Sequence, residues 1–274
     1  RGLPVVFVSS VGSYRGRLVG ATTGDVFLRR EQMRRLDDEP FRLLFATRVV
    51  AAKIGNGRGL LQRHLRNHPE LDLAAAVDAL DASQQRALDA ESLDALMGIE
   101  GDAAKTYFAG LGSTVRNEGF PFTSRSRRPP MDAFNAMLSL GYGLLLSEII
   151  AALHAVGLDP QMGLLHDLDY GRPSLALDLI EEFRHHLIDR MVLTLVNRGT
   201  TKSSWFEPGP KGGIYLSDTG RPQFLGAYDA LMTGKLYPKD AAGVDPRSML
   251  SQQAKALRES IRTGSPYEPA QFEG

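Results

Sequence analysis

Acidic and histidine side chains gather in one segment of the sequence, residues 164–184. His166 comes just before a stretch with helical spacing, and on that stretch Asp178 and Glu181 stand three residues apart. This spacing puts both carboxylates on one face of a helix. Their neighbours are mostly leucine and isoleucine, so unpaired charge there would be costly. A bound cation would remove that cost, which makes the segment a candidate metal site.

The same residues also admit a purely structural interpretation. Asp178 and Glu181 would form salt bridges to arginines such as Arg172 or Arg184, while His166 caps or fills a loop. Structural ion pairs are commoner than metal sites, so the segment taken alone favours this second interpretation.

A third acid, Glu100, lies between Gly98 and Gly101 in another stretch with helical spacing. Each glycine weakens a helix by about 1 kcal/mol relative to alanine, so the pair calls for a reason. Close approach of another backbone or of a ligand is one reason. The alternative is a break between two helices at Gly98, which would leave Glu100 in the first turn of the second helix.

An arginine cluster comes directly before a further apolar helix. Arg125, Arg127 and Arg128 precede the helix expected over residues 130–156, so their charges are held at the edge of a rigid element. Cations placed in this way suit the phosphates of a nucleic-acid backbone. The alternative is a solvated loop with Asp132 in the first helical turn, and the charge pattern does not separate the two.

The elements that must position these residues are mostly helical. Apolar residues recur at helical intervals from about residue 40 onward, and this change of pattern is the best domain boundary in the sequence. The periodicity predicts helices over residues 83–113, 130–156, 173–198, 222–236 and 249–261. Residues 117–128 and 205–217 are expected loops, and the second contains a short hairpin around residues 211–213.

The residues before that boundary predict β-structure. Three short runs, residues 4–9, 14–19 and 25–30, are typical of the last strands of a small antiparallel sheet. No strand precedes the first run, so we expect this β domain to be truncated here. The fold class is therefore α+β, with three parts: a remnant of the β domain and linker (1–36), a large all-α catalytic domain (37–238), and a C-terminal helix with a flexible tail (239–274).

Composition limits the classes of function. The chain has 274 residues, and its 32 basic and 32 acidic residues balance, so any DNA binding must come from local patches. The absence of cysteine excludes disulfides, zinc ribbons, iron–sulfur clusters and thiol nucleophiles, and it suits a cytoplasmic protein. The most apolar stretch, residues 138–158, contains Glu148 and His154. It is typical of a buried helix, so we expect no membrane span.

These segments, in this order, resemble the CRISPR-associated integrase family. The resemblance includes Gly-Ile-Glu-Gly at 98–101, Arg-Arg-Pro-Pro at 127–130, His166, the run 178–184 and Asn-Arg-Gly at 197–199. It implies a small β domain joined to a large helical catalytic domain. It also implies site residues: Glu100, His166 and Glu181 as catalytic metal ligands, and Asp178 as an accessory ligand.

The activity implied by the resemblance is DNA integration during spacer acquisition. The 3′-hydroxyl of a short DNA fragment, the prespacer, attacks a phosphodiester at the boundary of a CRISPR repeat, and the 3′-hydroxyl of the array departs. Two carboxylates and one imidazole suit Mn²⁺ and tolerate Mg²⁺. Arginines would hold the DNA backbone without reading bases: Arg125, Arg127, Arg128 and Arg172. His166 has a second possible role as a proton shuttle.

The resemblance also implies partners. They are double-stranded DNA with 3′ overhangs, repeat DNA, a second copy of the chain, a small dimeric ferredoxin-like adaptation partner, and a fused or associated upstream nuclease. Two alternatives remain open: a stand-alone metal-dependent DNA endonuclease that uses water, and a non-catalytic DNA-binding assembly subunit whose acids are ion-paired. His185 and His186 are expected to be surface or packing residues, because adjacent helical positions point in different directions.

Overall fold

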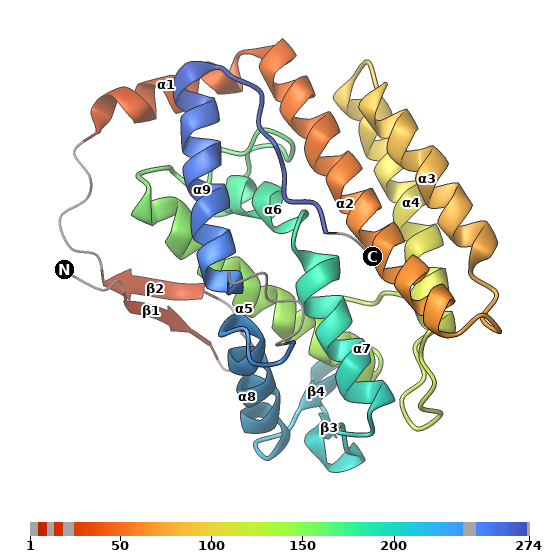
Figure 1. The fold of residues 1–274 in the computed structure, drawn as a ribbon. Helices are drawn as coiled ribbons and strands as arrows, with labels where there is room; N and C mark the ends of the chain where they lie inside the picture. The colour runs from red at the N-terminus through yellow and green to blue at the C-terminus, as the bar shows by residue number, and fades with distance from the viewer. Residues whose placement is uncertain (1–4, 10–13, 19–24, 238–244, 273–274) are drawn as a thin grey trace.

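The computed structural model describes residues 5–9, 14–18, 25–237 and 245–272, and these residues are mostly helical (Figure 1). Its α-helices are α1 (Val26–Leu36), α2 (Glu39–Asn67), α3 (Ala74–Leu88), α4 (Leu93–Ser113), α5 (Ala133–Ala155), α6 (Ser174–Ile180), α7 (Arg190–Asn197), α8 (Gly220–Met232) and α9 (Pro246–Thr263). A π-helical turn, η1 (His185–Asp189), and two 3₁₀ turns, η2 (Ser203–Trp205) and η3 (Pro210–Gly212), join them. The mostly helical body predicted from the periodicity is confirmed.

Two antiparallel hairpins accompany the helices. Strand β1 (Val5–Val8) pairs with β2 (Tyr14–Leu18), and β3 (Phe206–Pro208) pairs with β4 (Ile214–Leu216). The hairpin predicted around residues 211–213 is therefore confirmed, since η3 connects β3 to β4. Lys211 sits in its turn with a φ of 60°, next to Gly212 with a φ of 74°.

Helices α2, α3 and α4 lie side by side and form one layer of the molecule (Figure 1). The long helix α2 begins where Asp38 accepts a hydrogen bond from the Phe41 backbone, and Ser92 caps α4 in the same way. Small buried residues of α2 let the neighbouring helices approach closely; an added Cβ at Gly57 would lie 3.0 Å from the Tyr107 ring of α4. This layer fixes the spacing between α2 and α4.

Helix α5 runs through the centre of the fold and contacts α6, α7, α9 and β4. It is the one described helix that is long and apolar enough to cross a membrane by length and composition, and 56% of its most apolar window is buried inside the protein. Asp132 caps its start by accepting from the Asn135 backbone at 2.7 Å. The helix thus forms part of the core, as the charged interruption at Glu148 predicted.

The third predicted strand, residues 25–30, is wrong. Asp25 is the N-cap of α1: its carboxylate accepts a hydrogen bond from the Leu28 backbone at 3.0 Å. Leu28 and Gln32, four residues apart, are buried on one helical face, whereas Phe27 is 66% exposed. The helical spacing of these two buried residues therefore outweighs the strand-like composition of residues 25–30.

The predicted helix boundaries also differ from the structure. The stretch 83–113 contains the end of α3 and all of α4, separated by a turn before Ser92. Helix α4 then runs unbroken past Gly98 and Gly101, and an added Cβ at either glycine would meet nothing within 4 Å. Neither the break at Gly98 nor a close approach of another part of the described chain is found, and the approach of a ligand stays a prediction. The stretch 173–198 keeps a helical path but widens into the π turn η1.

The C-terminal segment is not the flexible tail that its Pro/Gly/Ser composition suggested. After α9 ends at Gly264, which has a φ of 77°, the chain packs back onto the core. Tyr267 is 2% exposed and contacts Phe45, with ring centroids 5.4 Å apart. The Phe272 backbone donates to Asn56 Oδ1 at 2.9 Å. The burial of the Tyr267 ring therefore outweighs the loop-forming composition of this segment.

Candidate metal centre and phosphate groove

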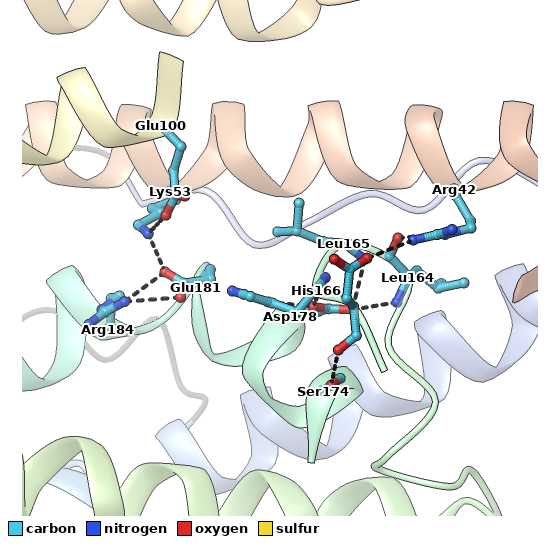
Figure 2. Close-up of polar contacts among 11 residues, drawn as sticks. Arg42, Lys53, Glu100, Leu164, Leu165, His166, Ser174, Asp178, Glu181 and Arg184 are labelled. Carbon is cyan, nitrogen blue, oxygen red and sulfur yellow. Dashed lines mark hydrogen bonds and ion pairs between the residues drawn. The ribbon is translucent and has the colours of Figure 1, made fainter. Parts of the chain in front are cut away.

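Lys53 joins two acids that are far apart in the sequence. Glu100 comes from α4 and Glu181 follows the last turn of α6, and the ammonium group of Lys53 on α2 forms an ion pair with both carboxylates (Figure 2). Lys53 Nζ lies 2.6 Å from Glu181 Oε2. The lysine side chain is 9% exposed, so this is a buried contact. The packing of α2 against α4 thus brings the acids together.

Arg184 contacts Glu181 from another side. Its Nη1 donates to both Glu181 carboxylate oxygens at 2.9 Å, and its guanidinium lies over the Tyr142 ring at 4.4 Å. Burial alone would raise the pKa of Glu181, but Arg184 and Lys53 together hold it well below its ordinary value. Glu181 is therefore ionised, and the ion pair to Arg184 considered from sequence is present.

His166 is held by Asp178. The imidazole Nδ1 lies 2.7 Å from Asp178 Oδ1, and Figure 2 shows the ring on the side of Asp178 that faces Glu181. Burial would lower the pKa of His166, but the hydrogen bond and charge of Asp178, with the charge of Glu181, raise it. Because Nδ1 is bonded to a carboxylate, Nε2 is the nitrogen left to face other groups.

Asp178 accepts every hydrogen bond that a carboxylate can accept. Oδ2 accepts from the backbones of Leu164 and Leu165 at 2.6 and 3.0 Å, and Oδ1 accepts from the His166 backbone and from its ring. A carboxylate offers about four such positions, so none remains for a metal. In this conformation Asp178 therefore positions His166, and its role as an accessory metal ligand stays a prediction.

The turn before His166 is built around a glycine. A Cβ on Gly163 would lie 2.5 Å from the Ser174 side chain and 2.7 Å from the His166 carbonyl oxygen, so no larger residue fits. Arg42 Nε donates to the Leu164 carbonyl at 3.1 Å, and Ser174 Oγ donates to the Asp167 carbonyl at 2.8 Å (Figure 2). These bonds fix the loop on both sides of His166.

A large groove opens beside this cluster. It has a volume of about 1560 Å³, and His166, Glu181 and Arg184 lie in its wall. Cationic side chains line the same groove: Arg125, Arg127, Arg128, Arg172, Arg184, Lys211 and Arg221. Of the predicted phosphate-binding arginines, Arg127 and Arg128 are exposed and Arg172 is half-buried. The sequence analysis missed Lys211 and Arg221, which come from the β3–β4 hairpin and the start of α8.

Arg125 differs from the other arginines of the groove. Its Nη1 donates to Asn135 Oδ1 at 2.8 Å and its Nη2 to Ser139 Oγ at 3.1 Å, and the guanidinium lies 5.4 Å from the centre of the Tyr142 ring. These bonds hold the loop before α5 against the helix. Arg125 thus has a structural role in this conformation, and its contact with DNA stays a prediction, since it also lines the groove.

A second buried cluster lies next to the ion pairs. Asp189, in the π turn η1, accepts hydrogen bonds from the hydroxyls of Tyr107 and Tyr142 and pairs with His185 Nδ1 at 2.7 Å. Burial lowers the pKa of His185, although Asp189 opposes this effect. His185 thus packs in the core, and His186 stacks on Phe272 with ring centroids 3.8 Å apart.

The donor set can be tested for its fit to a divalent cation. Among the described residues, no three His, Asp or Glu side chains already lie close enough together to hold a metal ion. The ammonium of Lys53 stands between Glu100 and Glu181 in this conformation. The donors themselves fit, since two carboxylates and an imidazole held by a carboxylate through its other nitrogen are typical of metal sites. In this conformation Lys53 supplies the positive charge that balances these two acids.

Lys53 is the main site residue that the sequence analysis did not identify. Its signal is a charged residue among Ala51, Ala52 and Ile54 on an apolar helical stretch, where a lone cation would need an acidic partner. The sequence analysis also did not identify the Asp189 cluster, because its members lie far apart in the chain. Tyr107 and Asp189 are separated by 82 positions.

Comparisons with known proteins identify similar sequences and folds. The family described as CRISPR associated protein Cas1 matches residues 1–230. The CRISPR-associated endonuclease Cas1 1 of Moorella thermoacetica is 38% identical over 274 residues, which cover 96% of this chain and 80% of that protein. A CRISPR-associated exonuclease Cas4/endonuclease Cas1 fusion of Geobacter sulfurreducens is 37% identical, with 98% of this chain and 49% of the fusion covered.

Solved structures share the fold. A chain of a Cas6-RT-Cas1–Cas2 complex has a TM-score of 0.82 and 27% identity, and the match covers 99% of this chain and 30% of that one. A casposase bound to an integration product has a TM-score of 0.83, with 97% of this chain and 73% of the other covered. Its identity of 23% means that it shows the fold alone.

Proposed function

Because the chain belongs to the family of CRISPR-associated Cas1 proteins, we propose that it is a metal-dependent DNA integrase. It would join the 3′-hydroxyl ends of short DNA fragments to a CRISPR repeat by transesterification during spacer acquisition. The observation that carries this proposal is that Lys53 joins Glu100 to Glu181, and that Glu181 and the Asp178-held His166 lie in the wall of a groove lined by arginines.

Glu100, His166 and Glu181 would hold Mn²⁺ or Mg²⁺. The bound ion would supply Lewis acidity at the scissile phosphate. Asp178 keeps the His166 ring in one orientation by accepting from Nδ1, so that Nε2 faces the acids. Arg127, Arg128 and Arg172 would bind the phosphate backbone along the groove. No base-specific contact is needed for these roles.

The proposed reaction exchanges one phosphodiester for another. A fragment's 3′-oxygen forms a new bond to phosphorus, and the bond to the 3′-oxygen of the array breaks, so that oxygen leaves as a 3′-hydroxyl after taking up a proton. No nucleotide energy source is required for this exchange.

The proposed partners follow from the names of the relatives. We propose that the chain works with a Cas2-like dimeric partner, as in the Cas6-RT-Cas1–Cas2 complex, and with a Cas4-like nuclease, as in the Geobacter sulfurreducens fusion. A second copy of the chain would complete the assembly.

An integration assay tests the function. A supercoiled repeat plasmid is incubated with labelled prespacer, Mn²⁺ and the partner, and the joined product is counted for the parent, Glu100→Ala and His166→Ala. Both variants should lose joining, whereas Lys105→Met, a change at an 85% exposed side chain of α4, should keep it. Variants that join DNA as well as the parent would overturn the proposed site.

The product also separates the alternatives. A stand-alone endonuclease would nick the plasmid without incorporating label, because water takes the place of the 3′-hydroxyl. The ion pairs of Glu181 with Lys53 and Arg184 are the observation that favours a non-catalytic assembly subunit. Such a subunit would shift DNA in a gel but neither nick nor join it.

A further inference from the structure

Lys53 carries a role that the proposed reaction does not use. Its ammonium group contacts Glu100 and Glu181 together, and the residue is 7% exposed. These are the same two carboxylates that the proposed function gives to a divalent cation. The ammonium of Lys53 therefore occupies the position between the acids that the proposed divalent cation would take.

The charges of the cluster favour one cation at a time. Glu100 and Glu181 bring two negative charges, and Lys53 and Arg184 bring two positive charges, so the cluster is balanced as it stands. A divalent ion added beside Lys53 would repel the ammonium strongly at such short range in a buried environment. Removal of the ammonium from between the acids relieves that repulsion and frees the acceptor positions that it occupied, while Arg184 keeps its bonds to Glu181.

Displacement of the lysine would start from an incompletely packed side, where the space holds about one water-sized group. A small cavity of about 10 Å³ lies next to this lysine, lined by Gly57, Tyr107 and His185 as well as by Lys53 and Glu100. A side chain at position 57 would intrude here, since its Cβ would lie 3.0 Å from the Tyr107 ring and 3.2 Å from the His185 ring. The flexible four-carbon stem of a lysine suits such a displacement better than a planar guanidinium would.

We propose that Lys53 is a built-in counter-cation, which holds Glu100 and Glu181 in place while no metal is bound and is displaced from between them when a divalent cation binds. This inference rests on the proposed function, because it assumes that the acids bind a metal. It makes the lysine a competitor of the metal and a support of the metal-free fold at the same time.

Metal affinity tests the competition. Calorimetric titration with Mn²⁺ compares the parent, Lys53→Met and the control Lys105→Met, whose lysine lies on α4 near Glu100 but is paired with Asp102 at the surface. Methionine keeps the apolar stem and removes the charge. We expect Lys53→Met to bind Mn²⁺ at least about tenfold more tightly than the parent, and Lys105→Met to match the parent. A purely structural lysine predicts the opposite sign, because disturbed acids bind metal more weakly.

Thermal unfolding provides the second measurement. In EDTA, Lys53→Met should have a lower midpoint temperature of unfolding than the parent, because its two acids lose their shared cation. In saturating Mn²⁺, the midpoint temperature of Lys53→Met should be at least as high as that of the parent. A variant that folds only when Mn²⁺ is present supports the proposal as well.

Two outcomes would overturn the proposal. One is a folded Lys53→Met that binds Mn²⁺ no more tightly than the parent; the other is a variant that fails to fold with and without Mn²⁺. Failure of the proposed function looks different: neither the parent nor Lys53→Met would bind Mn²⁺ at a site that Glu100→Gln removes. A parent without measurable binding, beside a Lys53→Met variant that binds, supports the competition.

Discussion

Among single side chains, Asp178 has the most demanding set of contacts in the site. It is fully buried, it ties together the backbone of three successive residues, and it fixes the ring of His166. A substitution here acts on the orientation of His166 without removing any proposed metal ligand. Its consequences can therefore be separated from those of removing a ligand.

Asp178→Asn should lower both Mn²⁺ affinity and strand joining by about 10- to 100-fold, as is typical when the carboxylate behind a ligating histidine is lost. The asparagine has one acceptor oxygen where the carboxylate has two, so some of the backbone donors at residues 164–166 also lose their partner. Calorimetry and the integration assay provide the two measurements. Asp167→Asn, a change at a 96% exposed side chain of the same loop outside the groove lining, is the control and should stay within twofold of the parent. Equal effects of the two substitutions would contradict the role of Asp178.

His64 gives the protein a pH dependence away from the site. Burial, with the nearby His68 and Arg116, lowers the pKa of His64 to about 4, whereas the unfolded chain keeps about 6.5. Between these values the unfolded state binds more protons, so the free energy of unfolding falls as pH falls from about 6.5 to about 4. His64→Gln should flatten this slope in urea unfolding measured from pH 4.5 to 7. An unchanged slope in the variant would assign the pH dependence to other groups.

The single residues that sequence could predict are those with local signals. The spacing of His166, Asp178 and Glu181 within a short segment makes them candidates, although that spacing alone favours ion pairs and only the family resemblance predicts a metal site. Lys53 and the buried bonds of Arg125 depend on which helices pack together, and no local pattern carries that information. Composition also cannot tell an arginine that holds a loop from one that faces a groove.

Among the elements, the C-terminal segment 265–272 contributes more than its composition suggests. The Tyr267 hydroxyl donates to Glu182 Oε1 at 2.6 Å, and Asn56 Nδ2 donates to the carbonyls of Glu182 and Ala270 at 2.8 and 3.0 Å. Glu182 follows Glu181 directly in the chain. The segment therefore braces the turn that carries a proposed metal ligand.

Tyr267→Ala should lower the free energy of unfolding by about 3–5 kcal/mol, because a large buried ring is removed. Tyr267→Phe should cost about 1–2 kcal/mol, since Glu182 loses one buried hydrogen bond. Urea unfolding measures both. Tyr170→Phe is the matched control, because Tyr170 is fully exposed and its hydroxyl removal should be neutral. A neutral Tyr267→Ala would mean that the segment does not support the folded state.

The elements differ in how far sequence predicts them. Helices α5, α8 and α9 agree with the periodicity because each has an extended buried face, and aspartate side chains cap the starts of α5 and α9. Residues 25–30 were taken for a strand because their composition is β-like, although the positions 28 and 32 that point inward have helical spacing. The packing of 265–272 depends on Phe45 and Glu182, which are distant in sequence, so local composition could not predict it.

For the whole molecule, a balanced net charge coexists with a strongly basic groove. The 32 basic and 32 acidic residues cancel overall, yet the wall of the groove is rich in arginine. Affinity for DNA should therefore come from counterion release along this one surface and depend steeply on salt. The sequence identified part of this surface, while its contributions from Lys211 and Arg221 required the fold.

Arg128→Ala should weaken DNA binding at every sequence tested and reduce the slope of log K against log salt concentration by about 1. Fluorescence anisotropy with a labelled duplex, measured between 50 and 300 mM salt in steps of about 50 mM, would provide the slope. Arg262→Ala removes the same charge from α9, where Arg262 is paired with Glu259, and should leave the slope unchanged. Equal slopes in all three proteins would exclude Arg128 from the DNA interface.

The brace formed by residues 265–272 has a consequence for the order of events during translation. Asn56 precedes its partners Ala270 and Phe272 by 214 and 216 positions, and Glu182 precedes Ala270 by 88 positions. These bonds can form only after residues 265–272 leave the ribosome. A nascent chain can therefore pack its helices before residues 265–272 contact the turn after α6. Competence for chemistry would then arise only after residues 265–272 have been synthesised.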